Sequence, residues 1–125
     1  MGENNIQEVI CRYDIASDIL GVKSNKKFQY CETIEMDDDL LLDFDDDNVP
    51  VSLEILDASK RFNLPRESLD NIVFFKMEVC IEDKSISLKA VIGVLIDNVE
   101  NIQDIESFTS NHNHYPNGVS ELALI

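Results

Sequence analysis

Acidic side chains gather in one segment of this chain, at spacings that resemble a calcium-binding loop. Asp43, Asp45 and Asp47 occupy positions one, three and five of a twelve-residue stretch that ends at Glu54. An EF-hand loop supplies oxygen ligands to Ca²⁺ from these positions. Such a loop has glycine at position six, where this chain has Asn48, and the flanking residues are typical of strands. We therefore predict the turn of a β-hairpin here and no metal site.

Two groups of three consecutive aspartates lie at the two ends of one short predicted strand. As charged turns they would only discourage the pairing of strand edges between molecules. As a surface they could attract a basic protein and speed its association. The aspartates expected to bind a partner are Asp37, Asp38, Asp39, Asp45, Asp46 and Asp47.

Other residues with catalytic or metal-binding chemistry are isolated. His112 and His114 alternate with asparagines and would share a metal if they lay in a strand, but no acidic or cysteine ligand follows at a useful spacing. Ser59 lies near Asp57, but the two histidines are far away in the sequence, which disfavours a hydrolase triad. We expect no catalytic residue, no metal and no cofactor.

The one basic cluster visible in the sequence is small. Lys60, Arg61 and Arg66 occur within D-A-S-K-R-F-N-L-P-R and are surrounded by acidic residues. Local ion pairing is therefore expected, rather than phosphate binding.

Composition narrows the class of partner. The chain has 125 residues, 25 of them acidic and 10 basic, and a net charge of −15. Such a surface repels phosphate backbones and anionic lipids, so a basic protein is a better partner than nucleic acid or membrane. The alternative is that the acidity only confers solubility. The cysteines Cys11, Cys31 and Cys80 are widely spaced, which predicts reduced, mostly buried thiols in a cytoplasmic protein without a signal peptide.

Alternating apolar and polar residues predict five closely spaced strands in the first half of the chain. The connections between them are too short for crossover helices, so the pairing should be antiparallel. Asp57 is expected to cap a helical turn over 58–62, and Pro65 to open a short helix over 65–69. The five strands are predicted over 8–13, 19–23, 30–36, 40–44 and 49–55.

The second half begins with a longer hairpin. Alternating runs over 73–81 and 86–96 predict its two strands. Both faces of these runs carry apolar residues, which indicates that both faces are covered. We expect the cover to be a second copy of the chain in a homodimer.

The remaining residues predict a helix and a tail. Asp97 and Glu100 resemble a capping box, and apolar residues follow at helical spacing, which predicts a helix over 98–108. The polar residues after it predict a loop, and 110–125 is expected to be a flexible tail with an apolar end.

Several segments of the first half stand in an order and spacing that resemble domain-of-unknown-function family 2283, a group of small bacterial and archaeal proteins. The resemblance covers 9–62. Asn48 and Ser52 depart from it, because the family usually has glycine at both positions; asparagine tolerates the positive φ that the turn needs. The segments are Tyr13-Asp14, Ser17-Asp18-Ile19-Leu20, Glu32-Thr33 and Leu53-Glu54-Ile55-Leu56-Asp57-Ala58-Ser59-Lys60.

The resemblance implies a small cytoplasmic binding protein and no catalytic residue. The family has no established enzymatic activity, and its genes often lie beside genes for small toxin-like proteins. Antitoxin-like behaviour is therefore one implied role.

Together these features predict one domain of the α+β class, a mostly antiparallel meander of hairpins with short helices. It would comprise a family-like region (9–62), a second hairpin plus helix (63–109) and the tail. The expected function is a non-enzymatic, antitoxin-like interaction module that masks a basic toxin with its acidic surface. The alternative is a small-molecule or ion-binding domain.

Overall fold

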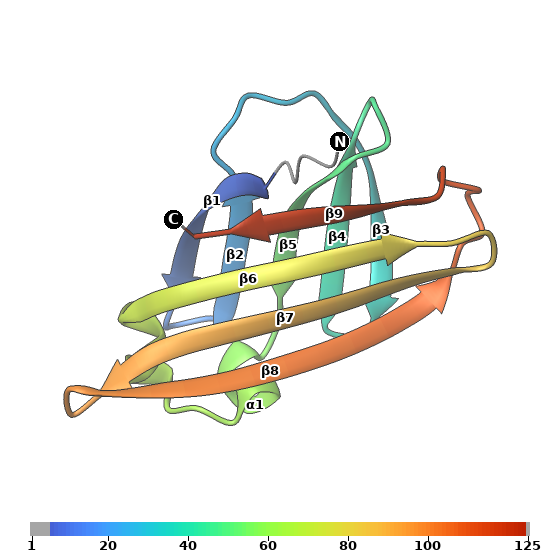
Figure 1. The fold of residues 1–125 in the computed structure, drawn as a ribbon. Coiled ribbons are helices and arrows are strands. Elements are labelled where there is room, and N and C mark those ends of the chain that lie inside the picture. Colours follow the sequence, from blue (N-terminus) through green and yellow to red (C-terminus); the bar gives the residue numbers. More distant parts are fainter. Residues whose placement is uncertain (1–5, 125) are drawn as a thin grey trace.

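Nine strands form a single curled sheet in the computed structural model, which describes residues 6–124 (Figure 1). The strand order is β3-β4-β5-β2-β1-β9-β6-β7-β8. The helical elements are α1 (Ala58–Phe62) and one short 3₁₀ helix, η1 (Arg66–Asp70). The strands are β1 (Ile6–Asp14), β2 (Ile19–Ser24), β3 (Tyr30–Asp37), β4 (Leu40–Asp45), β5 (Pro50–Ile55), β6 (Ile72–Ile81), β7 (Ser85–Ile96), β8 (Val99–Ser110) and β9 (Gly118–Ala123).

The expected α+β class is wrong, because the described chain is nearly all β. The helix predicted over 98–108 is instead the edge strand β8, paired with β7 from Ser85↔Ser110 to Ile96↔Val99. Asp97 and Asn98 both have positive φ, 51° and 65°. Two such residues in a row make the tight turn that matches the twist of a hairpin, so the chain reverses instead of starting a helix.

The strand predictions in the first half are confirmed. All five strands form within a few residues of the expected positions, and β1–β2, β2–β5, β3–β4 and β4–β5 pair antiparallel. The acidic turn at 45–48 reverses β4 into β5, with Asn48 at φ 64°. The turn therefore lies between strands, not between the helices that flank an EF-hand loop.

A strand also occupies the region expected to be a tail, 110–125. β9 pairs parallel with β1 and antiparallel with β6, and thereby joins the two hairpin systems into one sheet. Its Leu122 is fully buried. In the preceding loop, the Asn111 side chain donates to the carbonyls of Glu82 and Tyr115 (3.0 Å each), and Tyr115 stacks on Phe44 with ring centroids 4.0 Å apart.

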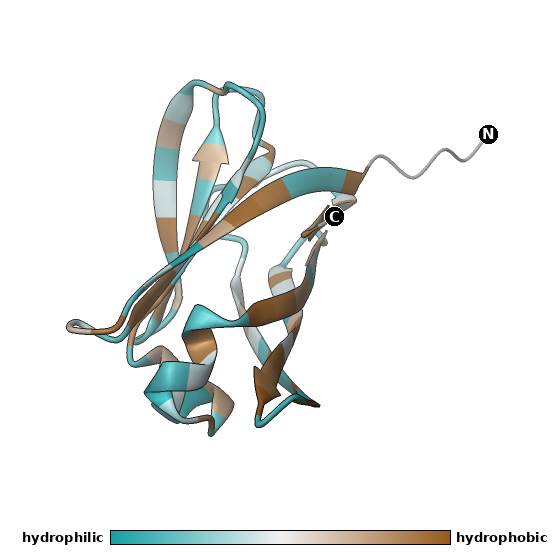
Figure 2. Ribbon diagram, turned by 90° about the vertical axis from the view of Figure 1, so that its left-hand side faces the viewer, coloured by the Kyte–Doolittle hydropathy of each residue, from teal (hydrophilic) through white to brown (hydrophobic). Residues whose placement is uncertain are grey.

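The curl turns the sheet into two layers that face each other. Strands β9, β6, β7 and β8 cross in front of β1–β5, and α1 lies at one open end (Figure 1). Hydrophobic and hydrophilic residues alternate along many of the strands (Figure 2), and the buried apolar residues of both layers form one core. The edge strands meet where the Ser107 hydroxyl donates to an Asp37 carboxylate oxygen (2.7 Å). No helix among residues 6–124 has the length and apolarity needed to cross a bilayer.

Candidate functional site

The residues of the family-like pattern converge on one buried carboxylate. Asp18 is 0% exposed and sits in the turn between β1 and β2 with φ 59°. Its Oδ1 accepts hydrogen bonds from the Tyr13 hydroxyl (2.6 Å) and the Ser59 backbone N–H (3.0 Å), and its Oδ2 accepts one from the Ser59 hydroxyl (2.7 Å). The Arg66 guanidinium lies 3.8 Å from Oδ2. We call Tyr13, Asp18, Ser59 and Arg66 the Asp18 clasp.

The Asp18 clasp ties α1 to the first hairpin. Ser59 is in the first turn of α1, so Asp18 satisfies a backbone N–H that the helix itself leaves unpaired. The Ala58 N–H donates to the Asp18 carbonyl (3.0 Å). The predicted cap, Asp57, makes no side-chain capping bond, so that prediction is wrong: the cap comes from a residue 41 positions away from Ser59.

Ionisation of Asp18 is favoured although the residue is buried. Burial opposes the charged form, but hydrogen bonds from Tyr13 and Ser59 and the nearby Arg66 outweigh it and lower the pKa of Asp18 below its ordinary value. The pKa of Tyr13 is raised by burial and by its bond to Asp18. Both shifts move the pKa away from neutral pH, where a general acid or base works best.

The six predicted partner-binding aspartates lie at the two ends of β4, as their positions in the sequence suggested. Two of them are used within the fold. Asp37 accepts two hydrogen bonds from Arg61 (2.9 and 2.7 Å), and Arg61 lowers the pKa of Asp37 far below its usual range. Asp45 Oδ1 accepts the N–H groups of Asp47 and Val49 (2.9 Å each) and so holds its own turn. Asp38, Asp46 and Asp47 are exposed, and Asp39 is half-buried.

The carboxylates do not assemble an EF-type site. Asp45, Asp46 and Asp47 have ligand atoms within 4.8 Å of one another. Glu54 lies on β5 opposite Leu41, near the other end of β4, and is not part of this group. Exposed carboxylates in a turn need no ion, and these three belong to the turn just described.

The remaining predicted groups are dispersed. His112 and His114 are both exposed in the loop before β9. The expected local ion pairing of the basic cluster is confirmed: Arg61 pairs with Asp37, and Arg66 lies beside Asp18 and donates to the Ile15 carbonyl (2.9 Å).

The three cysteines are free thiols, and only two of them are even partly buried. Cys11 and Cys80 are half-buried, whereas Cys31 is exposed, contrary to the expectation of mostly buried thiols. Burial raises the pKa of Cys11 to about 11, so this thiol stays neutral at physiological pH.

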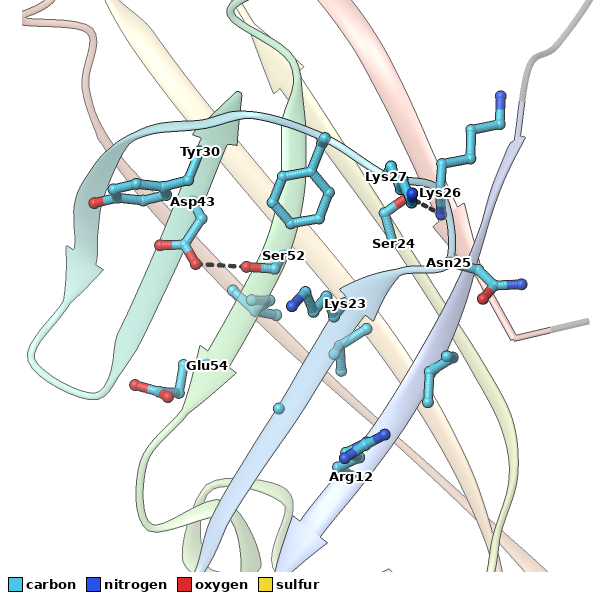
Figure 3. A pocket seen from close by; sticks show the side chains of 15 residues that line it. Arg12, Lys23, Ser24, Asn25, Lys26, Lys27, Tyr30, Asp43, Ser52 and Glu54 are labelled. Atoms are coloured by element: carbon cyan, nitrogen blue, oxygen red, sulfur yellow. Dashed lines mark hydrogen bonds between the residues drawn. The ribbon is translucent and has the colours of Figure 1, made fainter. Parts of the chain in front are cut away.

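A hollow that the sequence analysis missed lies on the outer face of the sheet, beneath the loop that follows β2 (Figure 3). We call it the basic trough. Its volume is about 970 Å³. Four of the chain's ten basic side chains line it, together with the carboxylates of Asp43 and Glu54. These basic residues are Arg12, Lys23, Lys26 and Lys27.

Sheet register creates the basic trough. Arg12 pairs with Gly21 and Ile10 pairs with Lys23, so the side chains of Arg12 and Lys23 project from adjacent strands on the same face. Gly21 contributes no side chain and leaves the floor open. Lys23, Lys26 and Lys27 are close together in the sequence, but only the β1–β2 pairing brings Arg12 to them.

One wall of the basic trough is held by a chain of hydrogen bonds. The Tyr30 hydroxyl contacts Thr33 Oγ1 (2.7 Å), which donates to Asp43 Oδ1 (2.6 Å), and Ser52 donates to Asp43 Oδ2 (2.5 Å). Both oxygens of Asp43 are therefore occupied. Above the floor, the Lys23 ammonium lies 5.6 Å from the centroid of the Phe28 ring.

Comparison with known proteins bears on the first half of the chain. Residues 11–59 match the family described as "Protein of unknown function (DUF2283)". The resemblance inferred from the sequence is thus confirmed. This DUF2283 segment includes Tyr13, Asp18 and Ser59 of the Asp18 clasp, and it ends inside α1.

A curated relative extends the similarity. The chain is 37% identical over 83 residues to a protein of Methanosarcina mazei named "Putative hypoxanthine phosphoribosyltransferase". The match covers 66% of this chain and 65% of the relative, so it spans slightly less than two thirds of that protein. No solved structure matches the chain.

Replacing Asp18 tests the Asp18 clasp. Asp18→Asn keeps the shape of the side chain but puts an amide where two oxygens accept hydrogen bonds, so we expect the free energy of unfolding to fall by about 2–4 kcal/mol in urea denaturation. Asp57→Asn is the matched control, because Asp57 is exposed, has positive φ and makes no capping bond; it should change stability by less than about 0.5 kcal/mol. Equal effects of the two substitutions would refute the clasp.

The pH dependence of stability follows from the same carboxylates. The pKa values of Asp18 and Asp37 are lower in the folded chain than in the unfolded chain, so their contribution is present above the unfolded value and lost as pH falls through the folded values. We expect urea unfolding to show stability declining steeply below about pH 4. The stability of the Asp18→Asn variant should decline less steeply over the same pH interval. An unchanged slope would contradict a lowered pKa of Asp18 in the folded chain.

Proposed function

We propose that this chain is a non-enzymatic interaction protein, the antitoxin-like member of a toxin–antitoxin pair, which binds a basic protein partner. The proposal rests on one observation: some aspartates at the ends of β4 fix the turns, and others remain exposed. Asp37 accepts the Asp39 N–H and Asp45 accepts the Val49 N–H, which fixes the two turns, while Asp38, Asp46 and Asp47 remain exposed on them.

Rigid turns make these exposed carboxylates suitable for binding. A partner does not have to order the loops on association, so less of the interaction energy is lost. The net charge of −15 attracts a basic partner over a distance and raises the association rate at low salt. A toxin that acts on nucleic acid would present a basic surface for this protein to mask.

The relative's name describes a phosphoribosyltransferase, but we do not propose that activity for this chain. Asp18, Asp37 and Tyr13 have shifted pKa values, and all of them are engaged in contacts within the fold. Perturbed groups at a catalytic centre would instead face a substrate. A binding role accounts for the same residues without a reaction.

We also propose a homodimer formed through the outer face of β6, β7 and β8. Phe74 and Ile102 lie on either side of Gly93 on this face and are 39% and 58% exposed. Along the same face, Lys89 lies between Glu78 and Glu106, so both signs of charge are present. A second copy, placed by a two-fold axis, would bury the apolar groups and pair these charges.

Partner binding is tested by removing the exposed carboxylates. Asp38→Asn, Asp46→Asn and Asp47→Asn together should weaken the complex with the neighbouring gene's product at least about tenfold, measured by titration calorimetry, and reduce its salt dependence. The control combines Glu67→Gln, Asp70→Asn and Asp83→Asn, which removes equal charge elsewhere. An equal loss of affinity in both variants, or no growth rescue on co-expression of the wild-type chain, would count against the proposal.

The homodimer is tested by light scattering coupled to size exclusion. Wild-type protein should elute as a dimer, and Ile102→Asp should give a monomer because it places a charge in the apolar contact. Ile15→Asp makes the same change at an exposed isoleucine in the β1–β2 turn and should leave the dimer intact. A monomeric wild-type protein would refute this assembly.

A further inference from the structure

Cations gather around the basic trough although the chain as a whole is strongly acidic. Within residues 6–124 the ion pairs are Arg61–Asp37, Arg66–Asp18 and Lys76–Glu121, and none of them involves a trough residue. The trough has four cations against two carboxylates, while the chain has 25 acidic residues against 10 basic ones. The local excess of positive charge in the basic trough is suited to binding an anion.

We propose that the basic trough binds a small phosphorylated molecule that carries a planar ring, of the size of a mononucleotide. The phosphate would lie between Arg12 and Lys23 on the floor, whereas the Lys26 side chain on the loop above points away from them (Figure 3). A guanidinium binds two phosphate oxygens at once, and lysines add point charges. A dianionic phosphate gains more from several cations than a single carboxylate does, because the Coulomb energy scales with charge.

The ring of the ligand has a surface to stack on. Tyr30 borders the trough and is 54% exposed. Its hydroxyl is held through Thr33 by Asp43, so the aromatic face is presented in a fixed orientation. Bases stack favourably on exposed aromatic rings in proteins that bind single-stranded nucleic acid. Ile10, 44% exposed, adds apolar contact at the opposite side.

The size of the hollow and the surrounding charge favour a small molecule over a polynucleotide. A volume of about 970 Å³ lies within the range of small-molecule sites. A longer phosphate backbone would leave the basic trough and extend over a surface that carries the rest of a −15 charge, where it is repelled.

The probes are adenosine 5′-monophosphate, adenosine and inorganic phosphate, and binding is followed by calorimetry and by amide chemical shifts in NMR. We expect the monophosphate to bind and to shift trough residues, with adenosine and phosphate each binding at least about tenfold more weakly. A short single-stranded oligonucleotide should bind more weakly than the monophosphate.

Three variants localise the binding. Arg12→Gln with Lys23→Gln removes floor charge, and Gly21→Val fills the floor while keeping every charge. A Cβ at Gly21 would lie 3.8 Å from the Arg12 carbonyl oxygen, an ordinary contact, so the second variant should fold. Both should weaken monophosphate binding at least about tenfold. Lys60→Gln with Lys84→Gln makes the same charge change at exposed lysines away from the trough and should bind like the wild type.

Several results would overturn the proposal. They are no saturable binding of the monophosphate, equal binding of adenosine, equal binding of inorganic phosphate, tighter binding of the oligonucleotide, or unchanged binding in Gly21→Val with intact thermal unfolding. The acidic-turn variants used above do not alter trough residues, so failure of partner binding and failure of ligand binding are separate outcomes.

Discussion

A fully buried, ionised aspartate holds the first hairpin and the helix of this fold together. Removing a carboxylate from water costs free energy. At Asp18 this cost is offset by hydrogen bonds from the Tyr13 hydroxyl and from the hydroxyl and N–H of Ser59, and by the nearby Arg66 guanidinium. These donors come from β1, α1 and η1, so the carboxylate can be satisfied in one arrangement of the chain. Arg61 and Ser107 likewise donate hydrogen bonds to the Asp37 carboxylate, where β8 meets the end of β3.

Local patterns predicted much of the fold, and contacts between distant segments account for what they missed. Alternation identified the strands of both hairpins. The turn formed by Asp97 and Asn98 was misread because Val99, Ile102 and Ile105 suit a helix as well as a strand, although only Ile105 is buried. Strand β9 is short, and its parallel pairing with β1 leaves no local signal. The segment 23–27 supplies three of the trough cations, and the β1–β2 register, which is not visible in the sequence, adds Arg12.

The polar residues of the DUF2283 segment therefore serve mainly to hold the fold together. Tyr13 and Ser59 donate hydrogen bonds to Asp18 within the fold. The charged groups that face solvent form two surfaces of opposite sign. Exposed carboxylates stand on the turns at the ends of β4, and cations surround one hollow on the outer face of the sheet. This separation of charge suits a small protein that meets a basic macromolecule with one surface and an anionic ligand with another, while its pKa-shifted groups stay within the fold.

The charge state of Asp18 tests this account most directly. Carboxyl carbon chemical shifts of the folded protein, followed by NMR from neutral to acidic pH, report the ionisation of each aspartate separately. We expect the Asp18 signal to keep its ionised value as the pH is lowered, until the protein unfolds, because the pKa of Asp18 is lowered in the fold. An Asp18 signal that titrates at the ordinary aspartate value of about 3.9 in the folded protein, or that is already protonated at neutral pH, would contradict this expectation.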